Sequence, residues 1–69
     1  MYNLKVGQLW QVKAERNAPE FAVPIIILSV EKNPNKGDIC FWQRINSEDF
    51  VEKSYVTAVL NHCDLISDV

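Results

Sequence analysis

The sequence predicts an all-β fold in which five short strands close into a small barrel, with one helical turn before the last strand. Apolar and polar residues alternate over several short segments, residues that favour turns separate these segments, and only one stretch has the pattern of a helical turn. Closure into a barrel would remove the exposed edges of such a small sheet. With 69 residues, of which 48% are hydrophobic, residues 1–69 are expected to form a single domain.

The first strand is expected within VGQLWQVKAE, residues 6–15. Its apolar residues share one parity: Val6, Trp10, Val12 and Ala14. This alternation is typical of a half-buried strand. The next segment, RNAPEFAV over residues 16–23, contains Pro19 and has no period, so we expect a loop in which Phe21 packs back onto the core.

A hairpin is expected at the centre of the chain. Residues 24–30, PIIILSV, are rich in β-branched side chains and too short for a helix, which predicts a strand that is apolar on both faces. Residues 31–38, EKNPNKGD, favour turn geometry. Residues 39–45, ICFWQRI, resume the pattern of a strand, and two strands joined in this way form an antiparallel hairpin.

Both parities of the strand at residues 39–45 carry apolar residues. One parity holds Ile39, Phe41 and Ile45, and the other holds Cys40, Trp42 and Arg44. Phe41 is expected in the core because both of its companions are aliphatic. Trp42 is expected either in a second small core or at a contact site on the surface.

The C-terminal third is expected to form a strand, a helical turn and a last strand. The turn NSED over residues 46–49 precedes the alternating segment FVEKSYV over residues 50–56. The segment TAVLNH over residues 57–62 suits a helical turn with Thr57 as its N-cap. The chain then continues as a short strand, CDLIS, over residues 63–67.

This order of elements resembles that of the Src-homology-3-type small barrels. Those folds consist of a strand, a long loop, a hairpin, a short turn, a strand, a single helical turn and a final strand. The resemblance is one of pattern and covers nearly the whole chain. It implies an SH3-like β-barrel.

The N-terminal half resembles the opening of the MazF/PemK-like toxin endoribonucleases. VGQLWQVK, a loop and PIIILSVEKN are similar to the Gly-initiated strand and the Pro-led apolar strand of those proteins. In that family an Arg immediately before the Pro and a Thr after the third strand are implicated in RNA cleavage. Here Val23 stands in the place of the Arg, and RINSED offers Ser47 in place of the Thr pattern. The resemblance therefore implies a catalytically degenerate relative.

Composition and charge argue against several functional classes. The net charge is −2 and the basic residues are scattered, which disfavours nucleic-acid binding because such binding needs a local excess of Lys and Arg. The longest apolar run, Pro24 to Leu28, is far shorter than the roughly 18 residues of a membrane span. Two separated cysteines, Cys40 and Cys63, and an N-terminus without a secretory pattern favour a reduced, cytoplasmic protein.

The residue types of catalytic and metal sites do not form a convincing set. His62 and Cys63 are consecutive, and consecutive residues of a strand point to opposite faces. A zinc site usually requires three or four N or S ligands, for which one His and two Cys are a minimal supply. Glu48 and Asp49 lie in an expected exposed turn without the cleft that catalysis by paired carboxylates requires. We therefore expect no enzyme activity, no metal and no cofactor.

Aromatic side chains are the strongest candidates for a binding site. A barrel of this size buries only some of its seven aromatic residues, and an exposed Trp beside an Arg is typical of interface hot spots. The candidate binding residues are Trp42, Arg44, Tyr55 and Phe21. A candidate acidic surface consists of Glu48, Asp49 and Glu52.

These observations predict a non-enzymatic interaction module that binds a protein partner through an exposed aromatic surface. The partner can be a second copy of the chain, which would give a homodimer. Small acidic chains are common among bacterial and phage accessory proteins. We therefore expect a bacterial or phage origin, an expectation that comes from this association and not from a physical argument. The alternative is nucleic-acid binding, with Trp42, Tyr55 and Arg44 stacked on bases, or interference with a nucleic-acid-binding protein. The third interpretation is the degenerate relative of RNA-cleaving toxins.

Overall fold

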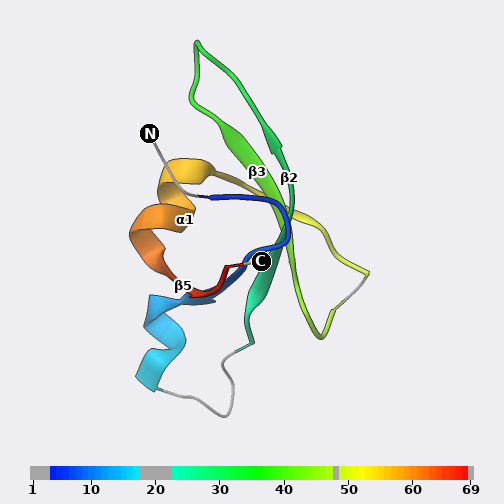
Figure 1. Ribbon diagram of the computed structural model, residues 1–69, viewed down its shortest axis with the longest axis vertical. Helices are drawn as coiled ribbons and strands as arrows, with labels where there is room; N and C mark the ends of the chain where they lie inside the picture. The colour runs from blue at the N-terminus through cyan, green and yellow to red at the C-terminus, as the bar shows by residue number, and fades with distance from the viewer. Residues whose placement is uncertain (1–3, 18–22, 48, 69) are drawn as a thin grey trace.

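The fold is built on one five-stranded antiparallel sheet. The computed structural model describes residues 4–17, 23–47 and 49–68. The strands are Leu9–Val12 (β1), Ile25–Glu31 (β2), Ile39–Arg44 (β3), Glu52–Tyr55 (β4) and Cys63–Ser67 (β5). A 3-10 helix, Lys13–Asn17 (η1), follows β1, and an α-helix, Val56–His62 (α1), joins β4 to β5 (Figure 1). The predicted all-β class is confirmed.

The sheet is open rather than closed into the predicted barrel. Its strands lie in the order β4-β3-β2-β1-β5, and within the described part of the chain no ladder joins β4 to β5. The seven-residue helix α1 contacts both of these edge strands. The two edges are therefore connected through a helix and not through backbone hydrogen bonds between strands. The resemblance to Src-homology-3-type barrels stays a prediction.

The first strand is shorter than the predicted segment of residues 6–15. Val6 is 59% exposed and Ala14 is also exposed, so the predicted apolar parity does not extend to either end. The chain turns into η1 after β1, and there Glu15 forms an ion pair with Arg44 of β3. A tertiary contact of this kind can outweigh the strand preference of a short segment.

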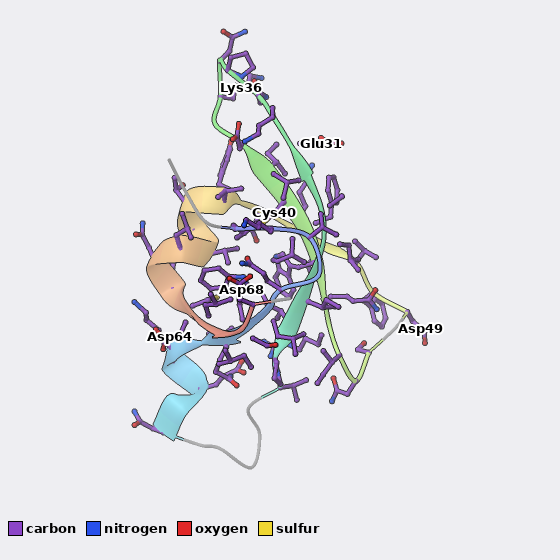
Figure 2. All side chains as sticks on the ribbon, in the orientation of Figure 1. Glu31, Lys36, Cys40, Asp49, Asp64 and Asp68 are labelled. Carbon is purple, nitrogen blue, oxygen red and sulfur yellow. The ribbon has the colours of Figure 1, made fainter. Side chains whose placement is uncertain are left out.

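The core lies on one side of the sheet. Its buried apolar residues are Leu4, Trp10, Ile25, Ile27, Cys40, Val56, Val59 and Cys63. Cys40 is completely buried, whereas Ile45 is 49% exposed, so the predicted inward parity of β3 is wrong. In Figure 2 Cys40 lies on the side of the β2–β3 hairpin that faces α1, and Glu31 lies on the opposite side. Because both parities of β3 are apolar, alternation alone does not identify the inner face.

The β2–β3 hairpin was predicted, and the contacts within its turn account for its formation. The side-chain oxygen of Asn33 accepts hydrogen bonds from the backbone N–H groups of Asn35 and Lys36. Gly37 has a φ angle of +92°, in the left-handed region that favours glycine. The turn residues therefore have the geometric roles that their types predict.

The helix α1 is longer than the predicted helical turn. It begins at Val56, and Tyr55 precedes it without a side-chain cap hydrogen bond, so the prediction of Thr57 as the N-cap is wrong. Val56 and Val59 are buried against the core, and tertiary packing of this kind is what stabilises short helices. No helix in the described ranges is both long and apolar enough to cross a membrane.

Candidate binding hollow around Trp42

Trp42 lies on the inner side of the sheet, partly buried against the core. Its indole N–H donates a hydrogen bond of 3.0 Å to the hydroxyl oxygen of Ser54 on β4. Trp42 lines two hollows on the surface. One, with a volume of about 180 Å³, extends toward α1 and is lined by Val12, Ile25, Trp42, Ser54, Ala58, Val59, His62 and Cys63. Trp42 therefore combines a core contact with an accessible surface.

The second hollow, which we call the Trp42 hollow, has a volume of about 330 Å³. It is lined by Trp42, Arg44, Ser47, Phe50 and Glu52. β3 supplies the first two residues, and Glu52 is the cross-strand partner of Trp42 on β4. Phe50 comes from the connection between these strands and is 68% exposed. The hairpin pairing of β3 with β4 thus places two aromatic rings and a carboxylate around one depression.

Arg44 is held by contacts within the protein. Its guanidinium donates two hydrogen bonds to the carboxylate of Glu15, at 3.0 and 2.8 Å, and a third to the backbone oxygen of Val23 at 2.9 Å. The hydrogen bond from Arg44 lowers the pKa of Glu15, and the same bond raises the pKa of Arg44. Arg44 therefore lines the hollow with its charge already compensated.

Two acidic residues, Asp49 and Glu52, lie in and after the connection between β3 and β4. Glu52 and Asp49 are both exposed, and Figure 2 shows Asp49 at the far end of the connection between β3 and β4. Within the described ranges, no cationic side chain forms an ion pair with Glu52. Glu48, the third residue of the predicted acidic surface, lies outside the described residues.

The structure separates Tyr55, another of the predicted binding residues, from Trp42. Tyr55 is the cross-strand partner of Ile39, on the parity of β4 opposite to Ser54. With Ile39, Lys53 and Ser54 it lines a different hollow of about 200 Å³. Phe21 lies outside the described residues. Among the predicted binding residues that the structure describes, Trp42 and Arg44 share a hollow and Tyr55 lines a different one.

Phe50 is the binding candidate that the sequence interpretation missed. The alternation over residues 50–56 places Phe50 in a strand, where an apolar side chain is expected to pack against its neighbours. In the structure it precedes β4 and is more exposed than any other described large apolar residue. An aromatic residue directly after the acidic turn SED was the signal that could have identified it.

The lining of the hollow combines aromatic, polar and charged groups. Its lining offers ring faces, one hydroxyl, one carboxylate and one compensated guanidinium. His62 is exposed on α1, and burial raises the pKa of the Cys40 and Cys63 thiols, which keeps both protonated and weakly nucleophilic. No group of three or more His, Cys, Asp or Glu side chains suited to a metal ion occurs within the described residues.

No family model, curated protein or solved structure matches this chain. The inference of function therefore depends on the geometry and chemistry of the chain's own residues.

Proposed function

We propose that the protein is a non-catalytic interaction module that binds a segment of another protein in the Trp42 hollow. The observation that carries this proposal is the lining of the hollow, in which the rings of Trp42 and Phe50 stand beside the carboxylate of Glu52. Aromatic residues are enriched where protein interfaces concentrate their binding energy. An aromatic side chain as exposed as Phe50 gains most when a partner covers it.

The charge of the hollow favours a partner segment that carries Lys or Arg. Glu15 compensates Arg44, so Glu52 supplies the unbalanced charge of the lining. A cationic side chain between the rings would gain about 0.5–1 kcal/mol from its attraction to an aromatic face at an exposed site. It would also approach the carboxylate of Glu52, and complementary charge steers association and selects partners.

The size of the hollow favours a short segment and transient binding. About 330 Å³ is near the lower end of ligand pockets, which span roughly 300–1,000 Å³. It can receive one or two side chains of an extended peptide. Contacts of this size belong to the class of weak, transient interfaces.

We propose an SH3-like barrel relative that works in the cytoplasm as a bacterial or phage accessory protein. Two buried cysteines without a disulfide support a reducing compartment. The compensation of Arg44 by Glu15 makes nucleic-acid binding at this hollow less favourable, because the charge and N–H groups of the guanidinium are no longer available to a phosphate.

Selection of peptides from a phage-displayed random library on the immobilised protein tests this function. The enriched peptides are then synthesised, and their dissociation constants are measured by isothermal titration calorimetry. Phe50→Ala is expected to weaken binding about tenfold, which corresponds to about 1.4 kcal/mol, because the peptide loses one ring of the hollow. Glu52→Gln is expected to weaken binding only of peptides that contain Lys or Arg.

Val51→Ala is the matched control. Val51 is adjacent to Phe50 and 57% exposed, but it does not line the hollow. The proposal is contradicted if no peptide is enriched, or if Val51→Ala weakens binding as much as Phe50→Ala does. A single-stranded oligonucleotide that binds at physiological salt and is displaced by none of the peptides would also contradict it.

A further inference from the structure

The face of the sheet opposite the core is unusually apolar, and we call it the outer face. Directly opposed residues of an antiparallel pair share a face, so the register assigns its members. The members on β2 and β3 are Ile26, Ser29, Glu31, Ile39, Phe41 and Gln43, and those on β4 are Lys53 and Tyr55. Ile26, Leu28, Gln43 and Ile45 line a shallow hollow of about 470 Å³ on this face.

The strand β2 carries apolar side chains on both of its faces. Ile25 and Ile27 are buried in the core, whereas Ile26 and Leu28 between and beside them line the hollow on the outer face. An antiparallel sheet with one solvated face normally alternates apolar and polar residues, and a strand apolar on both faces is normally covered on both. Figure 1 shows α1 on one side of the β2–β3 hairpin. Val56 and Val59 of α1 belong to the same core cluster as Ile25 and Ile27, whereas Ile26 and Leu28 on the outer face are only half-buried.

We propose that the outer face is a homodimer interface, covered by the outer face of a second copy of this chain. Two sheets that pack face to face form a sandwich about 10 Å thick, with strands aligned to within about 30°. This proposal goes beyond the peptide-binding function, because the outer face and the Trp42 hollow lie on different sides of β3.

Charge complementarity selects a second copy as the occupant. Glu31 on β2 and Lys53 on β4 are both exposed, lie on the outer face and have opposite charge. A two-fold axis along β3 places β2 of one copy over β4 of the other. Each Glu31 then lies on the side of the partner's Lys53, so the same complementary contact forms twice.

The area of the outer face sets the strength of this dimer. The strands β2, β3 and β4 have seven, six and four residues, and at about 3.3 Å per residue and about 4.8 Å between strands they cover roughly 270 Å² per copy. The total for two copies lies below the roughly 1,000 Å² of a standard specific interface, so the contact belongs to the weak, transient class. The dimer is therefore expected to dissociate with a constant of about 100 μM, and it would present two Trp42 hollows, so that a partner with two binding segments would gain avidity.

Sedimentation equilibrium of the full chain between about 1 and 300 μM tests the interface. The expected result is a reversible shift toward twice the monomer mass of 7.9 kDa as the concentration rises. Lys53→Glu is expected to raise the dissociation constant at least tenfold, because it places two acids together. The double variant Glu31→Lys/Lys53→Glu is expected to restore it to within about threefold. Exposed positions were chosen so that these variants keep the fold.

Lys36→Glu is the matched control, because Lys36 is exposed on the β2–β3 turn and the substitution changes the net charge equally. A monomer at all concentrations overturns the proposal, whatever the result of the peptide selection. Equal weakening by Lys36→Glu and Lys53→Glu, or a double variant that restores nothing, also overturns it. A monomer that still binds peptide would leave the proposed function intact, and a dimer that binds none would contradict that function alone.

Discussion

Gln8 is the buried polar residue on which the N-terminal part of the core depends. It is 1% exposed, and its side-chain oxygen accepts hydrogen bonds from the backbone N–H of Lys5 at 2.7 Å and the indole N–H of Trp10 at 3.2 Å. Its amide nitrogen donates to the carboxylate of Asp68 at 3.0 Å. One side chain therefore connects the segment before β1, the core tryptophan and the end of the chain.

Gln8→Leu is expected to lower the free energy of unfolding by about 2 kcal/mol. Leucine has a similar size, but it leaves the indole N–H of Trp10 buried without an acceptor, and an unsatisfied buried donor costs about 1–3 kcal/mol. Urea denaturation followed by circular dichroism measures the change. A loss below about 0.5 kcal/mol would show that water or another group replaces the amide.

The sequence predicts which residues share a site better than it predicts the face of the sheet on which they lie. The presence of Trp42 and Arg44 at a shared site could be predicted because a Trp and an Arg two positions apart on a strand share a face. The face itself could not be predicted, because Ile39 and Phe41 make the other parity equally apolar. The compensation of Arg44 by Glu15 depends on a contact between residues far apart in the sequence.

The 3-10 helix η1 is joined to β3 by the pair of Glu15 and Arg44, whose carboxylate and guanidinium are only partly exposed. The hydrogen bond from Arg44 lowers the pKa of Glu15 below its usual value of 4.5. A carboxyl group with a lowered pKa in the folded state contributes stability above its unfolded-state pKa. That contribution is lost as the pH falls through the folded-state pKa.

Glu15→Gln is therefore expected to lower the free energy of unfolding at pH 7 by about 1 kcal/mol, the scale of a partly exposed bidentate pair. The difference from the wild type should shrink as the pH falls below about 4.5. Chemical denaturation at pH 7, 5 and 3 measures it, with Asp49→Asn at an exposed position as the control for the loss of one carboxylate. A difference that stays constant over this range would rule out the ion pair as its source.

At the element scale, local turn chemistry and β-branched runs were sufficient for the central hairpin and for β5. The bounds of β5 at residues 63–67 agree with the prediction. The errors are at elements that tertiary contacts define. β1 ends early where η1 meets Arg44, and α1 gains length because Val56 and Val59 pack into the core. Short segments do not contain the information for such contacts.

At the scale of the whole molecule, the number and order of strands could be predicted, but the closure of the sheet could not. Alternation indicates where strands are and which residues they bury, whereas closure depends on whether two edge strands meet. Here α1 contacts both edges and no ladder joins them within the described part of the chain. The strand expected over residues 24–30 was predicted to be apolar on both faces, and we propose that a second copy of the chain covers its outer face.

A two-dimensional NMR titration shows directly whether the molecule recognises partners through the Trp42 hollow. A ¹⁵N-labelled sample is titrated with a peptide enriched on the protein. We expect shifts for the indole N–H of Trp42 and for the backbone amides of Phe50 and Glu52, with little change at Lys36 on the distant turn. Shifts confined to other surfaces, or no shifts at saturating peptide, would contradict it.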